Sequence, residues 1–258
     1  MKKIFVLLLA ISACTGAKKE DQASAESTTP VAGTEITTQP AQANALTDAQ
    51  RQEGWKLLFD GQSLQGWQIF KNRKNNTWEA KDGMLHCKPL NEKVKGDGDE
   101  RSDLMTTEEF QNFEFACEWK ISPEGNSGII YRVTEEFEQP FYSGPEYQLI
   151  DDQGYKPKQE PVHLTGANYD MQAPDALLAK PIGEWNLSRI VVNGKQVEHW
   201  LNGQKVVAYE LGSADWKKRK EASKWKDAKG YGMATKGHID LQDHGHEIWF
   251  RNVMVKAL

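Results

Sequence analysis

The sequence predicts an all-β protein: a jelly-roll sandwich of two antiparallel sheets with one short helical insertion. Three observations support this prediction. About a dozen short segments of strand-forming residues are separated by turn signals, two Asn-Gly pairs stand where tight hairpins need them, and one stretch alone has a helical composition. No internal repeat and no second linker divide the chain after residue 54.

The segment before the β-rich part predicts export and attachment to a membrane. Two lysines, an apolar run over residues 4–11 and small residues before Cys14 are typical of a bacterial signal peptide with a lipobox, over residues 1–14. An ordinary signal peptide with an unrelated cysteine is the alternative. Lipidation of Cys14 places the protein in the cell envelope, in the periplasm or at the outer-membrane surface, with the membrane as its partner.

Residues 15–50 are rich in Ala, Thr, Gln and Ser and predict a disordered linker, so the folded domain is expected over residues 51–258. The net charge of −5 and the lack of a basic stripe argue against a nucleic-acid partner. Cys87 and Cys117 form either a disulfide or two buried thiols. The nine tryptophans are more typical of a sandwich core than of sugar stacking.

Alternation of apolar and polar residues defines the strands. It is clearest over residues 113–121, "FEFACEWKI", where every second side chain is apolar. Asn193-Gly194 and Asn202-Gly203 predict a three-stranded meander between residues 185 and 211. Further strands are expected at Trp55–Phe59, Trp67–Phe70, Thr77–Ala80, Met84–Lys88, Asp103–Thr106, Gly128–Val133, Glu146–Ile150, His238–Asp243 and Glu247–Val255.

Two local features complete the predicted fold. The lysine-rich stretch 213–230 is expected to be helical, with Trp216 and Trp225 anchoring it to the sandwich. In the last strand the apolar parity changes between Phe250 and Val253, which predicts a bulge near Asn252.

Candidate site residues follow from strand parity. Glu146 and Gln148 share one face of a strand, where a carboxylate and an amide can meet a substrate; a solvent-facing glutamate is the alternative. Arg132 stands in the middle of a predicted strand and either binds a substrate oxygen or pairs structurally. The long connection over residues 161–186 predicts a binding loop or lid, with His163, Tyr169, Asp170 and Lys180 as candidates or as solvated residues.

The segment "HIDLQDHG", residues 238–245, places a polar row on one strand face. His238, Asp240, Gln242 and His244 share a parity opposite to Ile239 and Leu241. Two histidines six residues apart without an identified third ligand make a weak zinc site, so no metal ligands are assigned. A polar row lining a sugar-binding cleft explains the pattern better.

Several blocks together resemble one family. "GWKLLFDGQSLQGW", "GNSGIIYR", "EYQLIDD", "LTGANYD", "VVNGKQVEHWLNG" and "KGHIDLQDHG" stand in the order seen in the 3-keto-disaccharide hydrolase domain family, and the likeness covers residues 54–258. The resemblance implies a concanavalin A-like jelly roll and activity on glycosides whose glucose unit carries a ketone at C3.

Such a ketone acidifies the hydrogen on C2, so the chemistry implied is proton abstraction, elimination of the aglycone and hydration. In our hypothesis Glu146 or His163 is the base, Arg132 or a bound divalent cation meets the enolate oxygen, and His244 is the acid or a sugar ligand. Gln148, Tyr169, Lys180 and Gln242 would hold sugar hydroxyls, and no cofactor is firmly implied.

Two rival functions use the same scaffold. A non-catalytic carbohydrate-binding lipoprotein needs stacked aromatic residues and no base. An ordinary glycoside hydrolase needs paired carboxylates, and "EYQLID" lacks the E-x-D-x-x-E run of laminarinase-like enzymes. The 3-keto-glycoside hypothesis therefore fits the scattered polar residues best.

Overall fold

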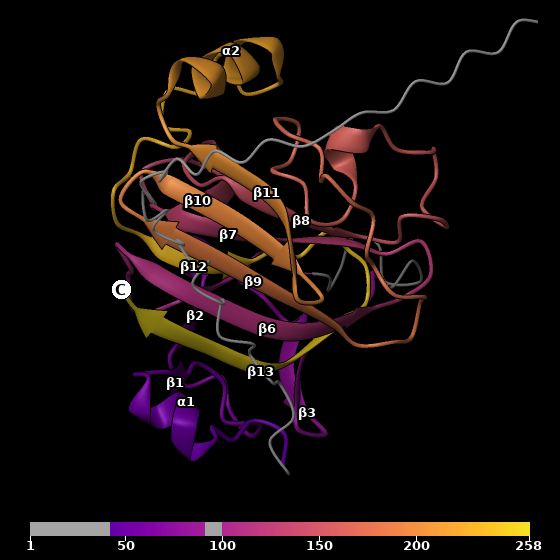
Figure 1. Cartoon of the computed structure of the whole chain (residues 1–258). Coiled ribbons are helices and arrows are strands. Elements are labelled where there is room, and N and C mark those ends of the chain that lie inside the picture. The colour runs from indigo at the N-terminus through magenta and orange to yellow at the C-terminus, as the bar shows by residue number, and fades with distance from the viewer. Residues whose placement is uncertain (1–41, 91–99) are drawn as a thin grey trace, which may run out of the picture. The chain divides into compact units, whose positions relative to one another are not determined.

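The structure is a computed structural model that describes residues 42–90 and 100–258. Two antiparallel sheets form a sandwich, which confirms the predicted fold class. In Figure 1 the strands β6, β9, β10, β11 and β13 lie in front of β7, β8 and β12. The eight-stranded sheet has the order β11-β10-β9-β6-β13-β4-β3, with β1 paired to β13, and the five-stranded sheet has the order β2-β5-β12-β7-β8.

Every predicted strand is present, and the bounds differ by a few residues at most. The eight-stranded sheet contains β1 (Lys56–Leu57), β3 (Trp78–Lys81), β4 (Met84–Cys87), β6 (Phe113–Ile121), β9 (Asn186–Asn193), β10 (Gln196–Leu201), β11 (Gln204–Glu210) and β13 (Ile248–Ala257). The five-stranded sheet contains β2 (Trp67–Ile69), β5 (Leu104–Thr106), β7 (Asn126–Val133), β8 (Glu146–Ile150) and β12 (His238–Leu241).

The core lies between the two sheets and is formed by alternate side chains of the strands. Phe115 and Trp119 from β6 join Tyr147 and Leu149 from β8 in one cluster of buried side chains. Burial of such aromatic and aliphatic surface is the main stabilising term of the fold. The other parity of β8, Glu146 and Gln148, therefore faces away from the sandwich core.

The helical insertion is shorter than predicted. Helix α2 spans Ala214–Ala222, and Ser213 caps its N-terminus by accepting a hydrogen bond from the Trp216 N–H. Figure 1 shows it at one end of the sandwich. The predicted anchors hold: the ring of Tyr231 stacks on Trp225 at 4.7 Å and on Trp216 at 6.0 Å between centroids.

The predicted bulge in the last strand is confirmed. The register between β13 and β6 shifts between Arg251 and Met254, and Asn252 has a φ of 51°. Asn tolerates this left-handed conformation better than most residues do. The bulge re-aligns the strand, so Phe250 and Val253 both reach the core.

The predicted linker ends too late in the sequence. Helix α1 (Asp48–Gln52) begins with a capping box between Thr47 and Gln50, and Asn44 bonds reciprocally with Asn252. The prediction of a disordered linker is therefore wrong for residues 44–50, because these residues pack on the domain. Residues 15–41 of that linker, the signal peptide and Cys14 lie outside the described residues.

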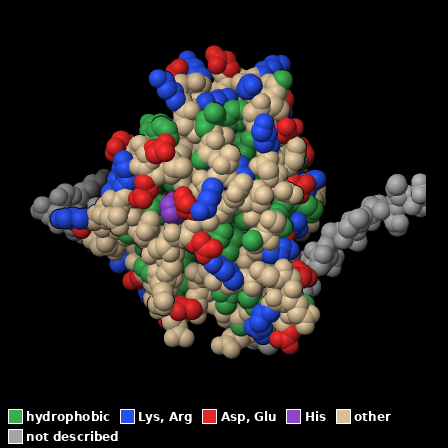
Figure 2. Space-filling model, turned by 90° about the vertical axis from the view of Figure 1, so that its left-hand side faces the viewer, with side chains coloured by type: hydrophobic (Ala, Val, Ile, Leu, Met, Phe, Trp, Pro, Cys, Tyr) green, Lys and Arg blue, Asp and Glu red, His purple; other side chains and the backbone are tan. Residues whose placement is uncertain are grey.

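Cys87 and Cys117 are both buried and both free, so the two-thiol alternative holds. On the face shown in Figure 2, Lys and Arg side chains are interspersed with Asp and Glu, without a basic stripe. Within residues 42–90 and 100–258, no helix is long and apolar enough to cross a membrane.

Candidate active site

A small cavity opens on the face of the five-stranded sheet that points away from the sandwich core. Its volume is about 220 Å³. The described residues that line it come from β7, β8, the segment just after β12 and three covering segments: Asn126, Phe141, Glu146, Gln148, Tyr169, Lys224, Gln242 and His244. Five of the eight predicted catalytic and substrate-binding residues are in this set.

Strand register explains why residues far apart in the sequence meet here. Ile130 of β7 pairs with both Asp240 of β12 and Glu146 of β8, so these side chains form one row across the sheet. Gly128 pairs with Gln148 and accepts a hydrogen bond from the Gln242 N–H at 2.9 Å, which makes the next row. The shared face predicted from parity is confirmed.

Glu146 is the carboxyl group at the centre of the cavity. It is 3% exposed, and burial raises its pKa from 4.5 to about 7. The ammonium of Lys224 and a hydrogen bond from Gln242 oppose the rise, whereas the charge of Asp103 adds to it. Glu146 can thus both accept and return a proton near neutral pH.

Gln148 supports this carboxyl group. With its amide nitrogen turned toward β7, Gln148 donates to Oε1 of Glu146 at 3.0 Å and to the Ser127 carbonyl at 3.1 Å. In this orientation its own oxygen faces Asn126. Gln148 therefore holds Glu146 in place and also presents an amide to the cavity.

Lys224 is the functional candidate that the sequence did not reveal. Its Nζ lies 4.1 Å from the ring centroid of Tyr169 and 4.3 Å from that of Trp225. Its backbone N–H donates to Oδ2 of Asp170 at 2.6 Å, which fixes the segment after α2 beside the cavity. Partial removal from water lowers the pKa of Lys224, and the carboxyl groups of Glu146 and Asp170 oppose this. In the sequence this lysine is one of many in a lysine-rich stretch.

His244 stands at the exposed rim of the cavity and stacks on His246 at 5.5 Å between ring centroids. Partial removal from water lowers the pKa of His244, and the nearby His246 lowers it further. A lowered pKa makes the imidazolium form of His244 the minor form at physiological pH and makes that form a stronger acid.

Two further acids lie next to Glu146 without lining the cavity. Asp240 is fully buried, and burial raises its pKa well above the ordinary value. The charges of Asp103 and Glu146 and a hydrogen bond to the Asp103 carboxyl group raise it further. Burial also raises the pKa of Asp103 to about 7. Asp240 is thus held in its neutral, protonated form.

Arg132 does not join the site, so the prediction that it shares a hollow with Glu146 is wrong. It has a φ of 57°, and opposite it the register between β12 and β7 shifts between His238 and Ile239. The bulge breaks the period of two on which the prediction depended. Nη2 of Arg132 instead donates to the carbonyls of Gln111 and Gly194, both at 2.8 Å.

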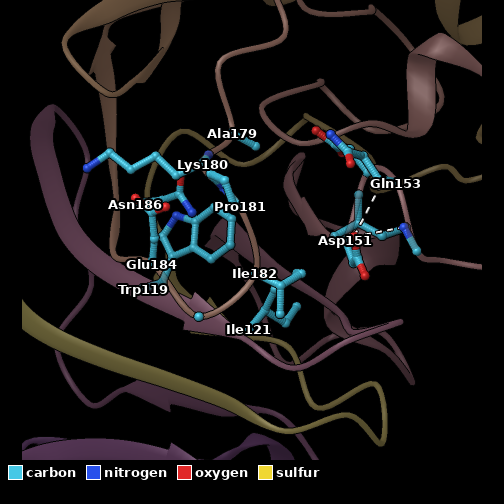
Figure 3. Close-up of a pocket in the computed structure, with 14 residues that line it drawn as sticks. Trp119, Ile121, Asp151, Gln153, Ala179, Lys180, Pro181, Ile182, Glu184 and Asn186 are labelled. Carbon is cyan, nitrogen blue, oxygen red and sulfur yellow. Dashed lines mark hydrogen bonds between the residues drawn. The ribbon is translucent and has the colours of Figure 1, made fainter.

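Lys180 and His163 also lie outside the cavity. Lys180 lines a separate cavity of about 580 Å³, where Figure 3 shows it across from Asp151 and Gln153, and its Nζ donates to the Trp185 carbonyl at 2.9 Å. His163 is bonded to Asp170 through Nε2 at 2.7 Å and stacks on Tyr169 at 4.8 Å. His163 thus contacts Tyr169, which lines the cavity, but does not line the cavity itself.

Comparison with known proteins decides the family. Residues 54–256 match the family of 3-keto-alpha-glucoside-1,2-lyase-like domains. The chain belongs to this family. A relative from Bacteroides thetaiotaomicron named 3-keto-disaccharide hydrolase is 31% identical over 290 residues, covering 100% of both chains.

Solved structures agree with this membership. A crystal structure of a candidate glycosyl hydrolase from Parabacteroides distasonis is 38% identical, with a TM-score of 0.76 over 84% of this chain and 100% of the other. A second one from the same organism is 27% identical, with a TM-score of 0.61 over 79% and 99%. The prediction of a glycosidase-type enzyme is confirmed by these likenesses.

The described residues contain no group of three or more His, Cys, Asp or Glu side chains placed to hold a metal ion. In the cavity itself, a divalent cation would meet the side chains of Glu146 and His244 and the amide oxygens of Asn126, Gln148 and Gln242.

Proposed function

We propose that this enzyme cleaves 3-keto-glucosides by elimination of the aglycone followed by hydration. The observation that carries the proposal is the content of the 220 Å³ cavity: one carboxyl group with a pKa of about 7, one ammonium group and one imidazole. An ordinary glycosidase places two carboxyl groups on either side of the bond. Among the described residues that line this cavity, Glu146 is the only carboxylic acid.

The elimination uses Glu146 as base. Its carboxylate removes the proton from C2, and the electron pair forms the enolate of the C3 ketone. The ammonium of Lys224, whose charge acts on Glu146, stabilises the negative enolate oxygen. Lys224 thus takes the role that the sequence analysis gave to Arg132. The enolate then expels the aglycone from C1, and the imidazolium form of His244 protonates the leaving oxygen.

The hydration reverses the proton transfers. Neutral His244 takes a proton from water while the hydroxide adds to C1, and Glu146 returns its proton to C2, so both groups regain their starting states. A carboxylate with a pKa near 7 is a stronger base than an ordinary one and is still substantially ionised at neutral pH. Gln148, Gln242 and Tyr169 line the cavity, and in this proposal they hold sugar hydroxyls.

A 3-keto-glucoside with a chromogenic aglycone tests the proposal. We expect aglycone release that slows when C2 carries deuterium, and a loss of about 100- to 10,000-fold in Glu146→Gln, since this is the range for a general base. Release from the unoxidised glucoside without an isotope effect would instead identify an ordinary glycosidase. Binding of the ketone without release would identify a carbohydrate-binding protein.

A chelator separates the two candidates for stabilising the enolate. If Lys224 has this role, the wild-type rate survives the chelator and falls in Lys224→Met. Loss of activity with the chelator and recovery with a divalent cation would assign the role to the cation. Lys226→Met, which removes a neighbouring exposed charge, is the matched control.

The lipid anchor is a separate proposal that follows from the sequence of residues 1–14. We propose that Cys14 is acylated and tethers the enzyme to the cell envelope, because an apolar run of this length followed by a cysteine is typical of a lipobox. The full chain should fractionate with membranes, and Cys14→Ser should move it to the soluble fraction. Membrane association that survives the substitution would contradict acylation at this position.

A further inference from the structure

Arg132 is a buried cation without a counter-ion among the described residues. It is 4% exposed, and within residues 42–90 and 100–258 its side chain donates to the carbonyls of Gln111 and Gly194. Its Nε–H has no acceptor in that part of the chain. An unpaired buried charge is destabilising, and a left-handed φ of 57° at this residue adds strain. Such a cost is typical of residues that bind a ligand.

Arg132 lines a pocket of about 440 Å³ at the end of the sandwich near α2. Trp216, which is 4% exposed, also lines this pocket, and its indole N–H has no acceptor among the described residues. Two side chains that line the pocket therefore each carry a donor without a partner in the described part of the chain. A ligand with acceptor oxygens complements such donors.

The charge around the pocket has one sign. Lys195 and Lys217 are exposed and line it with Arg132, and none of its described lining residues is Asp or Glu. The volume suits a group the size of one sugar ring. The pocket shares no lining residue with the Glu146 cavity, so its role is independent of the proposed reaction.

We propose that this pocket binds the oxyanion group of a small acidic saccharide, with the Arg132 guanidinium as its charge partner and the Trp216 indole N–H as a further donor. Guanidinium groups pair well with planar carboxylates and with sulfates, and the paired form is strongest where water is excluded. Lys195 and Lys217 attract the anion to the mouth of the pocket.

Calorimetric titration of the full chain tests the proposal with probes matched in size. Glucuronate carries a carboxylate, glucose 6-sulfate carries a sulfate, and glucose carries neither. We expect saturable binding of one or both acids that weakens in high salt, and at least 10-fold weaker binding of glucose. The acid that binds identifies the oxyanion. Equal binding of glucose, or no binding of either acid, would overturn the proposal.

Variants locate the binding. Arg132→Gln should abolish it, but this change also removes hydrogen bonds to two backbone carbonyls and can disturb the fold. Lys195→Gln and Lys217→Gln avoid that risk, and each should weaken binding by about 2- to 5-fold, the value of an exposed ion pair. Lys218→Gln removes an equally exposed charge next to Lys217 and outside the pocket. If the two pocket variants bind as Lys218→Gln does, the anion is held elsewhere.

Discussion

Glu146 occupies the space that a side chain at Gly128 would fill. A Cβ added to Gly128 would lie 3.0 Å from both Cγ and Cδ of Glu146 and closer still to Oε1. The two residues lie on neighbouring strands, and Gly128 is two positions from Ile130, the residue that pairs with Glu146. The absence of a side chain at position 128 is thus what lets the carboxyl group lie flat over β7 beside Gln242 and Gln148.

Gly128→Ala should therefore lower activity by displacing Glu146. The backbone can accept alanine, since Gly128 has no left-handed φ, but the carboxyl group must move by about an ångström. A displacement of that size at a catalytic group costs about 100-fold in kcat/KM. Steady-state kinetics on a 3-keto-glucoside measures the effect.

Ile129→Val is the matched control for Gly128→Ala. Ile129 is the next residue of the same strand and points into the sandwich core. The change should cost about 1 kcal/mol of unfolding free energy without touching Glu146. If both variants lose activity only in proportion to their loss of stability, steric support of Glu146 by Gly128 is refuted.

Strand parity predicts a site only as far as the register stays regular. Glu146, Gln148 and Gln242 were placed correctly because β7, β8 and β12 pair without interruption beside them. Arg132 was misplaced because a bulge shifts the register by one residue. No local pattern in "GIIYRV" signals that bulge, since Arg has no preference for a positive φ.

The missed residue, Lys224, shows a different limit. It belongs to no strand and reaches the cavity because Trp225 stacks on Tyr231 and Asp170 holds its backbone N–H. The contact with Asp170 joins residues that are about 50 positions apart, which no periodicity encodes. The position of Lys180 could not be predicted for the same reason. It belongs to a loop that lines a different cavity, and no periodicity encodes where that loop lies.

The buried acids predict that stability falls as pH rises through neutrality. In the folded state the pKa of Glu146 is about 7 instead of 4.5, that of Asp103 is about 7 instead of 3.8, and that of Asp240 is higher than its ordinary 3.8. At pH values between the pKa in the unfolded state and the pKa in the folded state, the unfolded chain releases protons that the folded chain keeps. Unfolding free energy should therefore decrease from about pH 4 to pH 7, by about 3 kcal/mol from Glu146 alone.

Urea denaturation at pH 4.5 and pH 8 measures this dependence. Asp240→Asn removes one of the raised groups while keeping its shape, so it should reduce the loss of stability between the two pH values. Asp227→Asn, at an exposed position, should leave the loss unchanged. A wild-type protein that is more stable at pH 8 than at pH 4.5 would contradict the assignment of these three groups as protonated acids.

The basic limb of the pH–rate profile should move in opposite directions in two variants. The charge of Asp103 raises the pKa of Glu146, and the charge of Lys224 lowers it. If ionised Glu146 is the base and the imidazolium of His244 is the acid, the higher of their two pKa values, that of Glu146, sets the basic limb. Asp103→Asn should then shift this limb to lower pH, and Lys224→Met should shift it to higher pH. The profile of kcat/KM on a 3-keto-glucoside is the measurement.

Lys226→Met serves as the control for charge alone, because this exposed lysine does not line the cavity. Its basic limb should coincide with that of the wild type. Shifts of Asp103→Asn and Lys224→Met in the same direction would show that a group other than Glu146 sets the limb.

The start of the domain is the part of the fold that the sequence describes least well. Residues 42–47 carry no strand or helix pattern, and composition favours a linker there. The structure fixes them through single side chains instead: Leu46 packs beside Trp55 and Met254, and Asn44 meets the β13 bulge. Contacts of this kind depend on the bulge, which exists only once β13 has paired with β6.

Asn44 should therefore be a stability determinant of the domain. Its Oδ1 accepts from the Asn252 N–H at 2.9 Å, and its Nδ2 donates to the Gly83 carbonyl at 2.7 Å. Its own φ is 56°, so Asn44→Ala loses both side-chain bonds and also strains the backbone, for a total of about 2 kcal/mol of unfolding free energy. Asn44→Gly loses the bonds without the strain and should cost less. Gln42→Ala, at an exposed position two residues earlier, should cost nothing measurable in the same urea titration. If all three variants unfold at the wild-type midpoint, residues 44–50 do belong to the linker and the domain begins after them.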